Sequence, residues 1–464
     1  MGSSMDNEVI QPKKQKNVLR MAVVTSFITT FMGSALNLSI PNLEEQFQVS
    51  GAMVGWVVTA FTIAVAAFSV PMGKIADAKG RRKVLIIGIS TFAVLSFLCA
   101  FSTAIWMLLA LRVLQGVAAA MIFSTNNAIL ISVFPGSERG RVLGLSTAAV
   151  YVGLSVGPVV GGILNTRLGW QSIFFVTCGV AVAALILAVI GAPERQTEVL
   201  SADFDLAGNI LYIAMIIAFL YGLTNLSITK YGWAIMTGGL LLCVLFVTVE
   251  RKAADPVIRV TMFSHDAVFT LSNLSALLNY GATFAISYLV SIYLQIVMGY
   301  SSQAAGLILI VMPAVQAAFS PLMGRLSDRI PPYKLASAGM ALCVVGLVLF
   351  SMLTVTMPIW HIIVTMIIVG FGFALFSSPN TNTVMSCVNK EDYSVANSIL
   401  ATMRTVGHSS SMAIVTIVVG LNLGDMGLAE APPAMLVSTM HKCFYIFIVL
   451  CVAGVFMSLK RRKN

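Results

Sequence analysis

Residues Gly73–Val84 read GKIADAKGRRKV, and this stretch decides the fold class of the chain. It places five cations and one carboxylate, Asp77, in a short turn between two long apolar runs that are almost free of charge. Such a turn joins two adjacent helices, and its cations also fix the side of a bilayer that it faces. The sequence therefore predicts a polytopic membrane protein.

The composition points to the same class. Of the 464 residues, 58% are hydrophobic and only 10% are charged, and the mean hydropathy is +0.92. Average soluble domains carry about 25% charged residues. The net charge of +10 resides in short loops, and no basic helix is interleaved with aromatic residues, so no nucleic-acid partner is expected. The seven cysteines are scattered without CxxC spacing, so we expect no disulfide framework, no metal site and no cofactor.

Fourteen segments are long and apolar enough to cross a bilayer, which takes about 20 helical residues. They lie near residues 18–40, 51–72, 84–103, 104–133, 142–164, 170–192, 206–224, 232–249, 267–296, 303–323, 335–354, 358–384, 394–421 and 441–459. An even number of spans places both chain ends on one side, and nearly all of the 28 Lys and Arg residues fall on that side. The exceptions are Arg167, Lys230 and Lys442 in the opposite loops and Arg112 and Arg404 within spans. This asymmetry predicts a multi-pass protein of the cell membrane with both termini in the cytoplasm.

The chain also contains an internal repeat. PMGKIADAKGRRK at Pro71–Lys83 follows the second predicted span, and PLMGRLSDRIPPYK at Pro321–Lys334 follows the tenth. In each copy a cation follows a glycine, and an aspartate comes four residues after that glycine. Two similar six-helix bundles with a substrate site between them would produce this pattern. The expected division is a cytoplasmic tail over 1–17, an N-terminal bundle over 18–192, a linker with two extra spans over 193–266, a C-terminal bundle over 267–459 and a cytoplasmic tail over 460–464.

Four motifs together resemble those of the major facilitator superfamily, most closely its fourteen-helix drug–proton antiporter branch. Residues 56–83 (WVVTAFTIAVAAFSVPMGKIADAKGRRK) are similar to the family's helix 2 and the loop after it. LRVLQG at Leu111–Gly116 resembles the helix-4 motif, and GLSVGPVVGG at Gly153–Gly162 resembles the helix-5 antiporter motif. YLQIVMGYSSQAAGLILIVMP at Tyr293–Pro313 is typical of the fourteen-helix branch. The resemblance covers nearly the whole chain and implies an all-α major facilitator fold, with two six-helix bundles and two additional central helices.

The resemblance further implies that the repeated loops form a conformational latch. Its residues are Gly73, Asp77, Gly80, Arg81, Arg82, Gly324 and Asp328. The glycines permit a tight turn and a close approach of two backbones. Asp77 can accept hydrogen bonds from a neighbouring helix N-terminus, and the arginines can pair with carboxylates of adjacent loops. Simple topological anchoring is the alternative, but it would need only cations, so the repeated aspartate favours the latch.

A second motif consists of small residues in the fifth predicted span. Its members are Gly153, Gly157, Pro158, Gly161 and Gly162. Glycines four residues apart line one helix face without side-chain bulk, so another helix can pack against that backbone, and the proline kinks the helix. The resemblance implies that this face seals against the other half and marks exporters. Ordinary close packing without gating is the alternative.

Polar residues within the spans are predicted to form a substrate or coupling site. Arg112 is the clearest, because a cation inside a membrane span is costly, and Gln115 lies almost one turn away on the same side. Arg404 and His408 form a second polar stripe, and His408 could titrate near neutral pH. The full set is Arg112, Gln115, Asn126, Asn279, Gln295, Asn380, Arg404 and His408. The alternatives are bonding of Arg112 to backbone carbonyls of a neighbouring helix and ordinary packing of His408.

The charge of this site departs from the family pattern. The acidic residue expected in the first span is replaced by Met32, and none of the 18 carboxylates falls in the middle of a predicted span. A site with Arg112 and Arg404 but no carboxylate would be net positive, which favours an anionic, zwitterionic or neutral amphipathic cargo. Proton coupling would then have to use His408, a span-end carboxylate such as Asp266, or the charge of the substrate.

The function implied by the resemblance is secondary active efflux of amphipathic small molecules, multidrug-type, by proton-coupled antiport and alternating access. The alternative within transport is an exporter of an anionic or zwitterionic metabolite or lipid-like substrate with unusual or no proton coupling. A non-transporting sensor or receptor on the same fold is the alternative from another class. No enzyme is expected, since no nucleophile set, metal cluster or paired carboxylates appear, and no Walker-type loop indicates ATP. The expected partners are a small-molecule substrate, protons and the lipid bilayer, and the chain is expected to work as a monomer.

Overall fold

The computed structural model describes residues 12–49, 51–191, 205–226, 230–253, 255–424 and 431–461, which form helices and no strand. In chain order the elements are α1 (Pro12–Ala35), η1 (Leu36–Ser39), α2 (Ile40–Phe47), α3 (Gly51–Lys79), α4 (Arg81–Cys99), α5 (Ile105–Val133), η2 (Gly136–Glu138), α6 (Arg139–Leu168), α7 (Gln171–Gly191), α8 (Leu206–Thr224), α9 (Gly232–Glu250), α10 (Thr261–His265), α11 (Ala267–Thr283), α12 (Ile286–Ile292), η3 (Tyr293–Val297), α13 (Ser302–Leu309), α14 (Val311–Leu326), α15 (Pro332–Phe350), α16 (Ile359–Ser386), η4 (Lys390–Asp392), α17 (Tyr393–Leu423) and α18 (Pro433–Leu459).

These helices confirm the predicted all-α polytopic fold. The described residues contain 14 helical segments that are long and apolar enough to cross a membrane. The last segment differs most from its predicted bounds, because α18 begins at Pro433 rather than near 441. Proline is well suited to the first helical turn, where its missing N–H is not needed. Lys442, which we placed in a loop, is therefore an exposed residue inside α18, and its ammonium group binds Asn422.

Six helices pack together in the first half of the chain. Contacts join α3 to α5, α1 to α6 and α7, and α4 to α5 and α7. Their buried apolar side chains form one continuous cluster whose members lie between Val18 and Ala188 and include Phe31, Phe92 and Phe174. This first half is thus a helical bundle with its own core.

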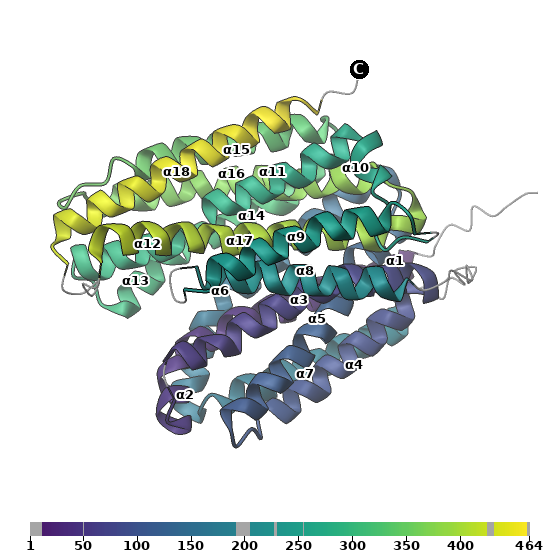
Figure 1. Ribbon diagram of the computed structural model, residues 1–464, viewed down its shortest axis with the longest axis horizontal. Helices are drawn as coiled ribbons and strands as arrows, with labels where there is room; N and C mark the ends of the chain where they lie inside the picture. The colour runs from purple at the N-terminus through teal and green to yellow at the C-terminus, as the bar shows by residue number, and fades with distance from the viewer. Residues whose placement is uncertain are drawn as a thin grey trace, which may run out of the picture.

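The second half repeats this arrangement. Here α15 packs on α16 and α18, α11 packs on α17 and α18, and α14 packs on α16. The two halves meet mainly where α6 lies against α14 and where α3 lies against α17. The linker helices α8 and α9 pack on each other, and α8 covers one seam by contacting both α3 and α17. Figure 1 shows this teal pair beside the seam.

One span of the second half is irregular within the membrane. Helix α11 ends at Thr283 and α12 begins at Ile286, and a π-helical turn follows over Tyr293–Val297. The irregularity leaves a backbone N–H at Ala285 without a helical partner, and it donates instead to Ser411 Oγ of α17 at 3.0 Å. Phe284 and Ala285, the two residues between these helices, keep right-handed helical dihedrals, so the irregularity is a turn within one span.

The two repeated loops lie at the same end of the molecule. We call this end the basic face and define it by residues 73–83, where α3 meets α4, and residues 324–334, where α14 meets α15. The end of α18 and α10 lie toward the same end, which is on the right in Figure 1. At the basic face the end of α3 and the segment after α14 each contact the opposite half.

Candidate functional site

Asp77, at the end of α3, binds the start of a helix in the other half. Its carboxylate accepts hydrogen bonds from the backbone N–H groups of Ser394 and Val395, each at 3.1 Å. These are the second and third residues of α17, whose N–H groups have no partner within the helix. Asp392, the residue that precedes α17, supplies no side-chain cap. Asp77 therefore caps α17 from the opposite half of the chain.

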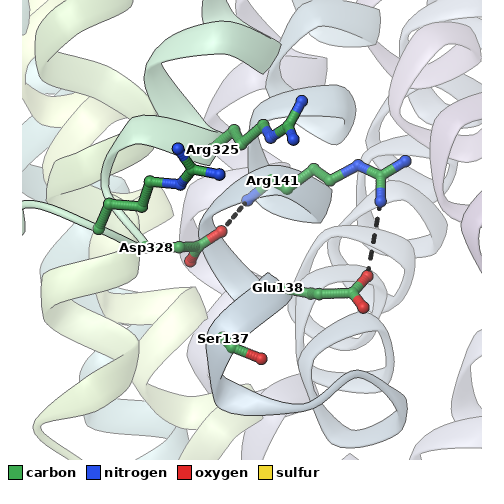
Figure 2. A pocket seen from close by; sticks show the side chains of 6 residues that line it. Ser137, Glu138, Arg141, Arg325 and Asp328 are labelled. Atoms are coloured by element: carbon green, nitrogen blue, oxygen red, sulfur yellow. Dashed lines mark hydrogen bonds and ion pairs between the residues drawn. The ribbon is translucent and has the colours of Figure 1, made fainter.

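Asp328, in the loop after α14, makes the equivalent contact in the other direction. Its two carboxylate oxygens accept from the backbone N–H groups of Gly140 at 2.6 Å and Arg141 at 3.0 Å, as Figure 2 shows for Arg141. These are again the second and third residues of a helix, α6, and its preceding residue Glu138 gives no side-chain cap. Burial raises the pKa of the Asp328 carboxyl, while the two hydrogen bonds oppose that shift.

Glycines make both contacts possible. A Cβ atom on Gly73 would lie 2.7 Å from Ser398 Oγ and 2.9 Å from the Ser394 carbonyl oxygen of α17. A Cβ atom on Gly324 would lie 2.9 Å from the Cα atom of Gly144 in α6. Such distances are too short for a side chain, so each aspartate reaches its helix only because a glycine lets the two backbones meet. Gly80 has a separate role, since its φ of 104° turns the chain between α3 and α4.

The arginines of the first loop bind differently from the expectation. Arg81 pairs with Asp77 of its own loop at 2.7 Å, donates to Ser394 Oγ at 3.0 Å and binds the Lys390 carbonyl. It thereby supports the Asp77 contact rather than pairing with a carboxylate of another loop. Arg82 donates to the Val189 carbonyl of α7 at 2.9 Å, within its own half.

The glycine face of α6 differs from the prediction in its partner. Cβ atoms on Gly153, Gly157 and Gly161 would all meet backbone or side-chain atoms of α1, in the same half. The α6 glycines that face the other half are Gly140 and Gly144, near its start, which contact α14. The Gly153–Gly162 face therefore packs against α1 of its own half, and not against the second half as predicted.

The polar residues predicted for the fourth span lie within the first half. Arg112 is fully buried, donates to the Val57 carbonyl at 3.0 Å and to Gln115 at 2.6 Å, and lies 4.2 Å from the centre of the Phe61 ring. Gln115 in turn donates to Ser96. These contacts match the structural alternative, in which the arginine bonds a neighbouring backbone.

Two further predicted residues also have local partners. Asn126 joins α5 to α1 through hydrogen bonds with Ala22, Thr25 and Ser26. Gln295 donates to Ser291 Oγ one turn earlier at 2.8 Å.

The remaining two asparagines lie inside the second half. Asn380 accepts from Arg461 at 2.6 Å and donates to the Ser272 carbonyl at 3.2 Å. Asn279 is fully buried, and neither of its amide atoms has a hydrogen-bond partner within the described part of the chain. The structure thus does not gather the predicted polar residues into one site.

Arg404 and His408 do lie together, beside the irregular turn between α11 and α12. The Arg404 guanidinium carbon is 5.1 Å from the centre of the Tyr280 ring, and its Nε has no hydrogen-bond partner among the described residues. The His408 ring stacks on Phe284 at a centroid distance of 4.0 Å and meets Tyr280 edge-on at 5.2 Å. We call Tyr280, Phe284, Arg404 and His408 the arginine–aromatic cluster.

The first half also reaches this cluster. Tyr151 of α6 packs edge-on against Phe373 of α16 at 5.8 Å, and Phe373 packs against Tyr280 at 5.2 Å. The arginine–aromatic cluster therefore belongs to the second half and is linked through Phe373 to Tyr151 of the first half.

No ion pair or hydrogen bond joins this cluster to a carboxylate in the part of the chain that the structure describes. Asp266, considered above for proton coupling, instead caps its own helix by accepting from Val268 at 2.8 Å and Phe269 at 3.0 Å. Met32 is buried in the first half, where its Sδ accepts from Thr177 Oγ1. The cluster offers planar rings and an unpaired guanidinium group, which suits an aromatic molecule that is not cationic.

Sequence reasoning missed several residues of these sites. Tyr151 and Tyr280 were not singled out because aromatic residues in apolar spans do not stand out from the lipid-facing ones. Asn397 was missed as well, although it donates to the Phe123 carbonyl at 2.5 Å and accepts from Asn127 at 3.1 Å across the halves. Its signal was available, since it is a polar residue inside the predicted span over 394–421.

Arg461 is the other missed residue, and it does not lie in a solvated tail. It is buried, donates to Asn380 at 2.6 Å and Ser272 at 3.1 Å, and bonds Ser458 as well. Burial lowers its pKa to about 10. The guanidinium group therefore ties together α11, α16 and α18 at the basic face.

Comparisons with known proteins agree on one family. The sequence profile of the Major Facilitator Superfamily matches residues 22–412. The riboflavin transporter RibZ of Clostridioides difficile is 26% identical over 96% of this chain and 97% of its own length. The cephamycin export protein CmcT of Amycolatopsis lactamdurans is 28% identical over 90% of this chain and 88% of its own. The crystal structure of the human organic anion transporter MFSD10 superposes with a TM-score of 0.70 at 13% identity, covering 96% of this chain and 99% of that one.

Proposed function

The chain belongs to the major facilitator superfamily, and we propose that it is a secondary active exporter of amphipathic, aromatic small molecules that are neutral or anionic. The arginine–aromatic cluster carries this proposal. An unpaired guanidinium group beside three aromatic rings attracts negative charge and planar apolar surface, and it repels a cation. Export is supported by the relative described as a cephamycin export protein, and a planar aromatic substrate is supported by the relative described as a riboflavin transporter.

Alternating access supplies the proposed mechanism. In this reading the basic face is cytoplasmic in the plasma membrane, and the two six-helix bundles over 18–192 and 267–459 rock about the cluster. The trans-capping contacts of Asp77 and Asp328 hold the cytoplasmic ends together while the opposite side opens. Breaking them frees the second and third N–H groups of α17 and α6 to bind water as the cytoplasmic side opens.

Protons are the proposed coupling ion, and His408 is the group within the cluster that can carry one. Its ring lies between Phe284 and Tyr280, one helical turn from Arg404. A proton on His408 beside Arg404 would be disfavoured by like charge, and a bound anion would relieve that repulsion. Proton and anion binding would then be linked within the same cluster.

Transport in proteoliposomes tests the proposal. Purified protein is reconstituted with a pH gradient, and accumulation is compared for riboflavin, for the planar anion fluorescein and for the planar cation ethidium. We expect transport of riboflavin and fluorescein but not of ethidium. Binding of the dyes without flux would instead indicate a sensor, and preferential transport of ethidium would refute the positive cluster.

Two variants locate the specificity. R404Q is expected to lower fluorescein transport by about tenfold, since a cation–π and charge contribution of this kind is worth about 1–2 kcal/mol. R167Q removes an exposed arginine at the far end of α6 and serves as the matched control, with no expected change. Equal fluorescein transport by R404Q and R167Q would show that Arg404 does not contribute to substrate recognition.

A further inference from the structure

A pocket on the basic face is not explained by the export cycle. It encloses about 490 Å³ and is shown in Figure 2. Its lining residues are Ser137, Glu138 and Arg141 from the first half and Arg325, Asp328 and Arg329 from the second. Because both halves supply the walls, the pocket exists only while the ends of α6 and α14 meet.

The charges in this pocket are unbalanced toward the positive. Its carboxylates are already engaged, since Asp328 caps α6 and Glu138 pairs with Arg141 at 3.6 Å. Arg325 and Arg329 form no ion pair with any carboxylate that the structure describes, although both line the same space. Guanidinium groups in this arrangement present a forked set of donors that matches phosphate or carboxylate oxygens.

The internal repeat indicates that Arg325 lacks a counter-ion. Lys74 directly follows Gly73 as Arg325 directly follows Gly324, so the two cations hold equivalent positions relative to Asp77 and Asp328. Lys74 has a counter-ion, because its Nζ lies 2.5 Å from Asp255 in the linker. Among the described residues, no linker carboxylate pairs with Arg325 on the α14 side of the repeat. Within the described part of the chain, the pocket thus lacks a counter-ion for Arg325 equivalent to the one that Asp255 provides for Lys74.

The surroundings of Arg325 indicate the source of that anion. Phe319, Leu322 and Arg325 recur at three-residue spacing on one side of α14 and are all exposed, with Leu322 at 56%. In a membrane-spanning helix an exposed apolar stripe faces lipid tails, and an arginine at its end reaches the headgroup level. The pocket therefore opens where phospholipid phosphates lie.

We propose that this pocket binds the phosphate headgroup of an anionic phospholipid, which takes beside Arg325 the place that Asp255 takes beside Lys74. The headgroup contacts arginines of both halves, Arg141 from the first and Arg325 and Arg329 from the second. A ligand that binds only the closed arrangement shifts the population toward it. Anionic lipid would therefore favour the closed state of the basic face.

Native mass spectrometry of the full-length protein in detergent tests this site. The protein is incubated with equal amounts of phosphatidylglycerol and phosphatidylcholine, and the ratio of the two retained lipids is measured. We expect the wild type to prefer phosphatidylglycerol and R325Q/R329Q to reduce that preference by about tenfold, because two charge-assisted contacts are lost. R167Q/K230Q removes two exposed cations outside the pocket and is expected to keep the wild-type ratio.

A second variant keeps both arginines and tests the comparison between Arg325 and Lys74. Ser137 lines the pocket, so S137D adds an internal carboxylate there and is expected to reduce phosphatidylglycerol retention as well. This variant decides the matter if R325Q/R329Q does not fold. A wild-type ratio in a folded R325Q/R329Q or in S137D would overturn the proposal. Displacement of the lipid by millimolar inorganic phosphate would overturn the lipid assignment and make the site one for a soluble anion.

Discussion

Replacing Asp77 with asparagine should open the basic face. Asp77 accepts two backbone hydrogen bonds from α17, each at 3.1 Å, and they exist only while the halves are closed. A hydrogen bond to a charged acceptor contributes about 1 kcal/mol more than a neutral one, so D77N should shift the equilibrium by about 2 kcal/mol. The bond from Arg81 does not count toward this difference, because Arg81 follows Asp77 in the same loop and moves with it.

A shift of about 2 kcal/mol changes the ratio of closed to open molecules by about 30-fold. Spin labels at Lys83 and Lys334, exposed residues of the two halves at the basic face, report it as a distance distribution by pulsed electron paramagnetic resonance. The labels are introduced in a cysteine-free background, and D77N is expected to add a population at longer distance.

The matched control is D266N. Asp266 also caps a helix by accepting two backbone N–H groups, at 2.8 and 3.0 Å, but both belong to its own half. D266N is therefore expected to lower the thermal stability without changing the distance distribution. An unchanged distribution in D77N, or equal changes in D77N and D266N, would show that trans-capping does not hold the halves together.

Three other predictions concern the basic face. G144V places a side chain against α14, where even a Cβ atom would lie 2.6 Å from the Ser320 carbonyl oxygen. It should therefore lengthen the distance between the labels at Lys83 and Lys334. G179V, at a glycine with open space around it, should leave that distance unchanged. D328N removes the charge from the equivalent contact with α6, so it should lengthen the same label distance as D77N does. R461M leaves the buried Asn380 oxygen without its donor at a cost of about 1–3 kcal/mol, so the unfolding temperature in detergent should fall by several degrees.

The sequence by itself determined the class of protein and the division into spans. Runs of about 20 apolar residues have one stable form in a bilayer, because every backbone group must be bonded within its own helix. The cations of Gly73–Val84 and of its repeat likewise lie at the ends of spans for a reason that is local, since charged residues leave the bilayer core. The repeated glycine and aspartate could also be predicted to have the same role in both copies, because their spacing is a local feature of a few residues.

Only the tertiary structure decided what those residues contact. Asp77 and Ser394 are 317 positions apart in sequence, and no pattern near either residue states that they meet. The same limit explains why Arg112 and Arg404, similar as cations within spans, differ in their surroundings. Arg112 bonds the Val57 carbonyl inside the first half, whereas Arg404 lies over the Tyr280 ring in the second. The same limit applies to the glycines of α6. Their spacing predicts that one face of the helix packs closely, but it does not predict whether α1 or α14 covers that face. Partner choice depends on how whole helices are arranged in space, and hydrophobic spans of equal length and polarity leave that arrangement undetermined until they pack.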